Sequence, residues 1–344
     1  MHSSRVRYVV ASAVAISTLT SCGGTSPASA TLAGLQRGSS QAVRYSSSCP
    51  CLYVANHVGV GNGGILVYPE DATKHTKPLQ DISGSNTELN QPRDVAVDSS
   101  GRIYVVSGSA ASGDSAVLVF ASGATGNVAP IETISGSNTA LDTPGGISLD
   151  PVNGDIYVAN SGNSSITIYA PGSNGNVGPL GAIQGASTGL DEPTGLVLDT
   201  SGNIYVPNYG TPAIYMYAAG SVGNVAPTKT IAGSRTELTK VDQLALDSNQ
   251  NVYAINATEV PNILEFTAGS NGNVKPTRYI DSKPPLYEPD GIALDQTGNI
   301  YVSNLLRGWE IYEFSPGARG KRVPPSNIID ERRYLSSPAG LAIR

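Results

Sequence analysis

The chain has 344 residues and a formal net charge of −6, with 14% charged and 40% hydrophobic residues. The acidic balance argues against nucleic-acid binding, which needs a basic surface, and the hydrophobic fraction argues against wholesale disorder. Three cysteines and three histidines are too few for a disulfide-dense scaffold or an array of zinc fingers.

Residues 1–22 are expected to be a targeting segment. A short basic start leads into an apolar run from Val9 to Leu19, which is too short to cross a bilayer. The sequence Leu-Thr-Ser-Cys that ends at Cys22 resembles a bacterial lipobox, which implies a diacylated Cys22 as the mature N-terminus. The alternative is an ordinary secretory signal cut after Ala30. We therefore expect a lipid-anchored protein of the cell envelope or, failing that, a secreted one.

Residues 23–48 are rich in Ser, Gly, Ala and Thr and show no apolar periodicity, so they are expected to form a flexible tether. The folded domain is expected to span 49–344. It opens with Cys49-Pro50-Cys51, whose redox state the sequence leaves open. A strained disulfide between the two cysteines is one alternative, and the favoured one is a buried Cys51 that begins a strand.

One unit of about four dozen residues repeats along the whole domain. Its clearest form is PDGIALDQTGNIYVSN from Pro289, and six tyrosines mark the copies: Tyr53, Tyr104, Tyr157, Tyr205, Tyr253 and Tyr301. Each copy predicts four short strands separated by Gly-, Pro- and Asn-rich turns. The Asp before the first turn, as in Asp98, Asp199 and Asp295, is expected to close that turn rather than to carry chemistry.

Six four-stranded units without helices predict an all-β, six-bladed β-propeller. The ends of the chain support this prediction. Residues 338–343 match a first strand that has no second strand after it, and residues 52–56 match a second strand with no first strand before it. We therefore expect the two termini to share one blade and close the ring.

The repeat resembles the NHL-repeat family of six-bladed propellers and, more loosely, the YVTN-type surface propellers. The resemblance covers residues 49–344. The family's usual Asp after the second strand is replaced here by Asn or Ser at Asn56, Ser107, Asn160, Asn208, Asn256 and Asn304. The resemblance implies a fold and leaves the function open, because propellers host many unrelated activities.

The residue after the repeat proline is expected to face the central channel. These positions are Arg93, Gly145, Thr194, Asp242, Asp290 and Ala339. Asp242 and Asp290 lie on adjacent units, so both carboxylates are candidates for one metal site, with Asn208, Asn256 and Asn304 nearby. Carboxylate and amide oxygens are the ligands that Ca²⁺ prefers. The alternative is that the two carboxylates cap loops or pair with Arg93.

The sequence around Asp290 also resembles the segment that carries a metal-binding Asp in gluconolactonase-type propellers, although none of the six channel positions is Glu. The favoured interpretation is a binding or scaffolding module rather than an enzyme. It would be a monomer whose ligand is an unidentified protein, glycan or small molecule. The alternative is a Ca²⁺-dependent, gluconolactonase-like hydrolase or lyase that uses the channel carboxylates.

Overall fold

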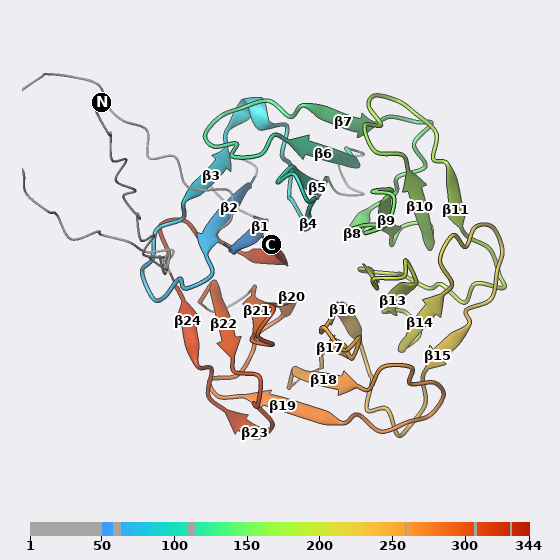
Figure 1. Ribbon diagram of the computed structural model, residues 1–344, viewed down its shortest axis with the longest axis vertical. Helices are drawn as coiled ribbons and strands as arrows, with labels where there is room; N and C mark the ends of the chain where they lie inside the picture. Colours follow the sequence, from blue (N-terminus) through green and yellow to red (C-terminus); the bar gives the residue numbers. More distant parts are fainter. Residues whose placement is uncertain (1–49, 58–62, 109–113, 259, 306–307, 331) are drawn as a thin grey trace, which may run out of the picture. The chain divides into compact units, whose positions relative to one another are not determined.

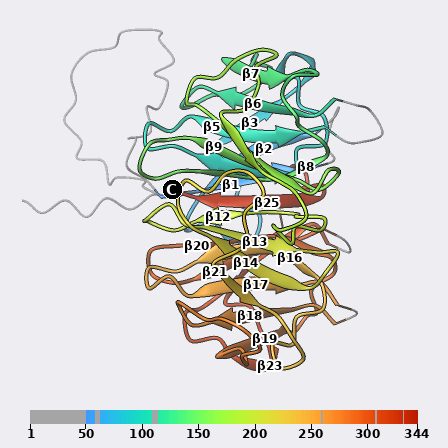
Figure 2. The ribbon, with the colours of Figure 1, turned by 90° about the vertical axis from the view of Figure 1, so that its right-hand side faces the viewer.

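A computed structural model describes residues 50–57, 63–108, 114–258, 260–305, 308–330 and 332–344. Six antiparallel sheets stand around a common axis as the blades of a β-propeller, which confirms the predicted fold (Figure 1). Seen from the side, the strands run roughly along that axis (Figure 2). Within the described residues, no helix has both the length and the apolar character that a membrane crossing requires.

The first three blades are built as follows. Blade 1 contains β25 (Pro338–Ile343), β1 (Cys51–Asn56), β2 (Gly64–Pro69) and β3 (Gln80–Ser83). Blade 2 contains β4 (Asp94–Val97), β5 (Ile103–Ser107), β6 (Ala116–Phe120) and β7 (Glu132–Ser135). Blade 3 contains β8 (Pro144–Leu149), β9 (Ile156–Asn160), β10 (Ser165–Tyr169) and β11 (Gly181–Ile183). A single 3-10 turn, η1 (Ser85–Thr87), follows β3 in the described chain.

The other three blades complete the ring. Blade 4 contains β12 (Val197–Leu198), β13 (Ile204–Asn208), β14 (Ala213–Tyr217) and β15 (Lys229–Ile231). Blade 5 contains β16 (Val241–Leu246), β17 (Val252–Asn256), β18 (Asn262–Phe266) and β19 (Arg278–Ser282). Blade 6 contains β20 (Pro289–Leu294), β21 (Ile300–Asn304), β22 (Glu310–Phe314) and β24 (Asn327–Ile329).

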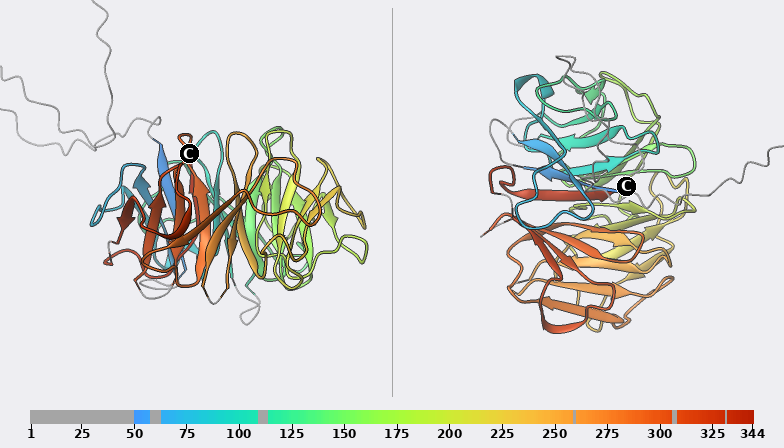
Figure 3. Two further views of the ribbon diagram at one scale, coloured as in Figure 1. Left: turned by 90° about the horizontal axis from the view of Figure 1, so that it is seen from below. Right: turned by 60° about the vertical axis from the view of Figure 1, so that its left-hand side comes forward.

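The two termini of the domain share blade 1, as the sequence predicts. Strand β25 is antiparallel to β1, with Leu52 opposite Ile343 and Val54 opposite Leu341. The backbone N–H of Cys51 donates to the carbonyl of Arg344 at 2.7 Å. Figure 3 shows the C-terminal strand among the blue strands of the N-terminal blade. This pairing leaves neither terminus as an open strand edge. Cys51 begins β1 partly buried, whereas Cys22 and Cys49 lie outside the described residues.

The hydrophobic core is divided among the interfaces between blades. Each of six clusters joins two neighbouring blades; one of them packs Val67 and Ile82 of blade 1 against Val105 and Phe120 of blade 2. Successive side chains of a strand point to opposite faces, so a middle strand such as β5 contributes to both of its interfaces and is buried throughout. Stability therefore depends on every blade having two neighbours.

Blade 5 departs from the predicted four strands. Residues Gly320–Val323 form β23, which pairs in parallel with β19 and makes this sheet five-stranded. The turn between β22 and β24 is long enough to reach across to the neighbouring blade, where it covers an edge that would otherwise expose unpaired backbone groups. The N–H of Lys283 donates to the carbonyl of Val323 at 2.8 Å.

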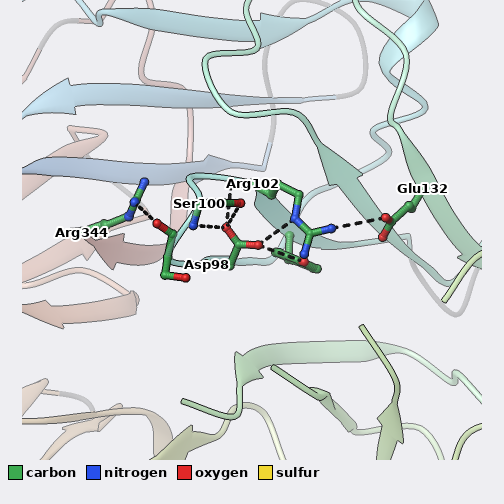
Figure 4. Close-up of polar contacts among 7 residues, drawn as sticks. Asp98, Ser100, Arg102, Glu132 and Arg344 are labelled. Carbon is green, nitrogen blue, oxygen red and sulfur yellow. Dashed lines mark hydrogen bonds and ion pairs between the residues drawn. The ribbon is translucent and has the colours of Figure 1, made fainter. Parts of the chain in front are cut away.

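The repeated aspartates close turns, as expected (Figure 4). Asp98 Oδ1 accepts the backbone N–H groups of Ser100 and Arg102, each at 2.9 Å, and Oδ2 accepts Arg102 Nε at 2.7 Å. Burial opposes ionisation of Asp98, but these hydrogen bonds outweigh it and lower its pKa to about 2. The C-terminal Arg344 donates to the carbonyl of Ser99 in the same turn, which ties the closing strand to blade 2.

Candidate functional site

A large cavity opens at the end of the channel where the inner strands begin. Its volume is about 1160 Å³. Four of the predicted channel residues line it together: Arg93 of blade 2, Thr194 of blade 4, Asp242 of blade 5 and Asp290 of blade 6. Gly145 of blade 3 lines it as well. The cavity therefore joins residues that are up to about 200 positions apart in the sequence, because five blades contribute the same repeat position to its lining; the predicted Ala339 of blade 1 is not among the lining residues.

The predicted asparagines lie behind the wall of the cavity, which is formed by the lining residues. Asn208 and Asn256, at the ends of β13 and β17, are buried, and their Oδ1 atoms accept backbone N–H groups of Asp191 and Thr239 at 2.7 and 2.8 Å. Asn304 accepts the N–H of Tyr287 in the same way. The residues that follow each of them line the cavity instead: Tyr209, Ala257 and Leu305. The asparagines thus hold the loops that shape the cavity and are not among its lining residues.

Asp242 and Asp290 form a partly buried carboxylate pair in the lining of this cavity. Removal from water is the largest effect on both side chains, and it raises both pKa values because it disfavours the charged form. The charge of Asp290 raises the pKa of Asp242 further, to well above its usual value. The Arg93 guanidinium opposes these effects and lowers both pKa values. The pair therefore holds on to a proton in a pH range where exposed carboxylates are ionised.

Arg93 lies just before β4 with its backbone fixed on two sides. Its N–H donates to Val106 at 3.0 Å, and its carbonyl accepts the N–H of Gly340 at 2.8 Å. Its Nε atom is buried and has no hydrogen-bond partner among the described residues. The guanidinium also lowers the pKa of His57, in addition to the larger effect of that imidazole's burial. The charge of Arg93 thus lowers the pKa values of groups from blades 1, 5 and 6.

The residues one position further along the repeat, next in sequence to the lining residues, form a second ring that we call the floor. Four blades carry glycine there, at Gly146, Gly195, Gly291 and Gly340, and two blades on opposite sides of the ring carry Asp94 and Gln243. Gln243 Nε2 donates across the axis to Asp94 Oδ2 at 3.4 Å. A Cβ atom on Gly195 would lie 2.0 Å from Gln243 Oε1, and one on Gly340 would lie 2.1 Å from Asp94 Oδ1. Gly195 and Gly340 therefore make room for the two longer side chains that meet at the axis, whereas Gly146 and Gly291 allow the backbone of the next inner strand to approach.

A second cavity of about 290 Å³ lies along the inner strands. It is lined by the remainder of the inner strands, including Val97, Leu149 and Leu246, together with Asp94 and Gln243. Asp94 is buried. Burial raises its pKa to about 7, although hydrogen bonds from the N–H groups of Ile147 and Val95 act in the opposite direction.

The sequence profile of the SMP-30/Gluconolactonase/LRE-like region matches residues 35–226, which is more than half of the chain. The chain belongs to this family. No curated protein sequence matches it at a significant level. The match identifies the family of the chain, whereas the resemblance to the NHL repeat concerns only the sequence of the repeat unit.

Solved structures add the fold of this family member but not its chemistry. A nidogen–laminin complex matches with a TM-score of 0.61 and 16% identity, over 86% of this chain and 98% of that chain. A protein of unknown function from Bacteroides caccae matches with a TM-score of 0.59 and 14% identity, over 86% of this chain and 99% of that chain. The periplasmic gluconolactonase PpgL of Pseudomonas aeruginosa matches with a TM-score of 0.57 and 13% identity, over 86% of this chain and 99% of that chain. At such low identity, these likenesses establish the propeller fold alone.

Besides Lys240 and Tyr209, the ionisable residues of this SMP-30/gluconolactonase family member that line the cavity outside the predicted repeat position include His57 and Glu288. His57 follows the last residue of β1, and Glu288 lies two residues before Asp290, whose pKa its charge raises. Both are adjacent to repeat positions that were recognised in the sequence, Asn56 and Pro289. Extending the search by one residue on either side would therefore have found them, including the Glu that is missing from the six channel positions.

The donor set does not fit a resident calcium ion. Ca²⁺ takes six to eight oxygen ligands, and the described residues contain no group of three or more His, Cys, Asp or Glu side chains that could hold a metal. The Thr194 hydroxyl donates to the carbonyl of Asp242, and a guanidinium already acts on both carboxylates. A dication between Asp242 and Asp290 would be repelled by Arg93.

Proposed function

We propose that this protein hydrolyses a small, polar lactone of the gluconolactone kind in the cavity of about 1160 Å³. The observation that carries the proposal is the Asp242–Asp290 pair, two partly buried carboxylates with raised pKa values that line a cavity large enough for a sugar-sized ligand. Membership of the SMP-30/gluconolactonase family supports this reaction class. It favours the hydrolase alternative over the binding-module interpretation of the sequence.

The pair supplies both halves of acid–base catalysis. The ionised carboxylate takes a proton from a water molecule as the water oxygen attacks the lactone carbonyl carbon. The tetrahedral intermediate carries a negative charge on the former carbonyl oxygen, which the Arg93 guanidinium stabilises. When the ring C–O bond breaks, the protonated carboxylate gives its proton to the departing ring oxygen. The product is a hydroxy acid, and a proton passed between Asp242 and Asp290 restores the starting state.

Hydrolysis is tested with a panel of γ- and δ-sugar lactones, because each turnover at neutral pH releases a proton that an indicator dye records. Asp290→Asn and Asp242→Asn should each lower kcat by about 10²-fold or more, the usual contribution of a positioned acid or base. Asp71→Asn removes the same charge from an exposed turn and serves as the control. A wild type that opens no lactone faster than buffer, or an unimpaired Asp290→Asn variant, would refute the proposal.

We also propose that the protein works outside the cytoplasm as a lipid-anchored monomer. The support is the basic, apolar and Cys22-ending order of residues 1–22, which lie outside the described residues together with the proposed tether 23–48. Metabolic labelling with a tagged fatty acid tests the anchor. Wild type should incorporate the label and Cys22→Ala should not, whereas labelling that persists in the variant would contradict the proposal.

A further inference from the structure

We propose that Arg93 takes the place of a divalent cation at the Asp242–Asp290 pair, so that the site binds an oxygen acceptor of its ligand through a guanidinium and works without a metal. This inference deepens the proposed function by naming the cation of its site. It concerns a residue that the repeat does not dictate, because the same position carries Gly145, Thr194 and Ala339 in other blades.

The placement of the charges is the first support. Arg93 projects from blade 2, and the two carboxylates come from blades 5 and 6 on the other side of the axis. Among the described residues, no ion pair joins Arg93 to either carboxylate, although its charge acts on both. The cation thus acts on both carboxylates from the lining of the same cavity without forming an ion pair with either of them.

The unused hydrogen-bonding capacity of Arg93 is the second support. A guanidinium has five N–H donors, and the buried Nε of Arg93 has no partner among the described residues. A buried donor without an acceptor is costly, so a ligand oxygen that accepts from it gains affinity. The ligand that fits has a carbonyl or carboxylate oxygen on the Arg93 side and hydroxyl groups on the side of the two carboxylates.

The electrostatic balance is the third support. One guanidinium and one retained proton offset the charges of the two carboxylates, and Lys240 in the same lining has the opposite charge to Glu288, so the attraction of the site for a dication is weakened. Removing the charge of Arg93 should leave two neighbouring carboxylates without a counter-charge. These supply hard oxygen ligands to Ca²⁺ or Mn²⁺, and water molecules in the cavity complete the coordination. The inference therefore predicts a gain of metal binding in a variant that loses a cation.

The test compares the melting temperature with and without added Ca²⁺ or Mn²⁺, together with the metal content of the purified full chain. Wild type should show no shift on addition of metal or EDTA, whereas Arg93→Met should be stabilised by several degrees. Asp290→Asn combined with Arg93→Met should lose that shift. Arg93→Lys keeps a charge and should stay insensitive to metal, and Arg93→Gln replaces Arg93→Met if the latter does not fold.

Lys240→Met is the matched control, because Lys240 lines the same cavity but stacks over the Tyr209 ring at 5.2 Å instead of acting on the pair. It should remain insensitive to metal. The inference is overturned by a wild type that contains stoichiometric metal which Asp290→Asn removes, or by Arg93→Met and Arg93→Gln variants that are folded and indifferent to both ions. Neither result bears on lactone hydrolysis, and a failure to find a lactone substrate leaves the metal measurements intact.

Discussion

The carboxyl of Asp94 should make the protein less stable as the pH rises from about 4 to about 7. In the folded state its pKa is raised to about 7 by burial, against an ordinary value of 3.8. Between these values the folded protein keeps the proton and the unfolded chain has lost it. The folded state therefore binds more protons, and the free energy of unfolding falls with increasing pH.

The size of the effect follows from the shift. A difference of about 3 pKa units corresponds to about 4 kcal/mol, and the slope inside the window is about 1.4 kcal/mol per pH unit for one proton. Asp290, whose charge contributes to the raised pKa of Asp94, and Asp242 also have raised pKa values, so the wild-type slope contains their contributions as well. The comparison with Asp94→Asn isolates the contribution of Asp94 itself.

Urea unfolding followed by circular dichroism at a series of pH values measures this slope. The Asp94→Asn curve should be flatter than the wild-type curve, so that the variant gains about 4 kcal/mol relative to wild type between the two ends of the window. Any constant cost of placing an amide beside Gln243 shifts the whole curve without changing its slope. Asp71→Asn should run parallel to wild type. Parallel curves for wild type and Asp94→Asn would refute the assignment of the floor carboxyl.

Three further perturbations test the fold. Deletion of residues 338–344 removes β25 and opens blade 1. The melting temperature should fall by well over 10 °C, since burial of Leu341 alone is worth about 2 kcal/mol. A melting temperature within a degree or two of the full chain's would contradict ring closure. Gly195→Ala should lower the free energy of unfolding by several kcal/mol because the new Cβ meets Gln243, and adding Gln243→Ala should restore much of the loss. An equal loss in the wild-type and Gln243→Ala backgrounds would argue against the contact. Asn176→Ala should cost about 1 kcal/mol, because Asn176 Oδ1 accepts the N–H of Asn138 in the preceding blade at 2.7 Å; an unchanged urea midpoint would contradict this link.

The sequence was sufficient to predict the ring, because each blade is a short-range pattern of apolar strands and turn residues that repeats in the chain. The shared blade 1 was predictable for the same reason, since its two halves are incomplete copies of that pattern. The fifth strand of blade 5 was not predicted. It arises from a contact between β23 and β19 of neighbouring blades, and the local composition of Gly320–Val323 does not encode such a pairing.

The candidate site was predictable where it follows the repeat and not where it depends on distances across the axis. Arg93, Thr194, Asp242 and Asp290 occupy equivalent positions, so symmetry alone placed them on one cavity. The asparagines share that regularity, yet hydrogen bonds to the loops hold them behind the wall. The sequence could not show whether Arg93 contacts the carboxylates or stands apart from them, because side chains from opposite blades meet only in the assembled ring.

The departures from the repeat are therefore the most informative residues of this propeller. Glycine two residues after the start of the motif is required for close approach of the inner strands, and only blades 2 and 5 replace it. These blades lie opposite each other, so Asp94 and Gln243 can meet across the axis without crowding a neighbour. Blade 2 also supplies Arg93, and blade 5 also supplies Asp242. The same two blades thus supply the floor residues, Arg93 and one carboxylate of the pair, so a change in the floor that shifts the inner strands should also alter the ionisation of the Asp242–Asp290 pair.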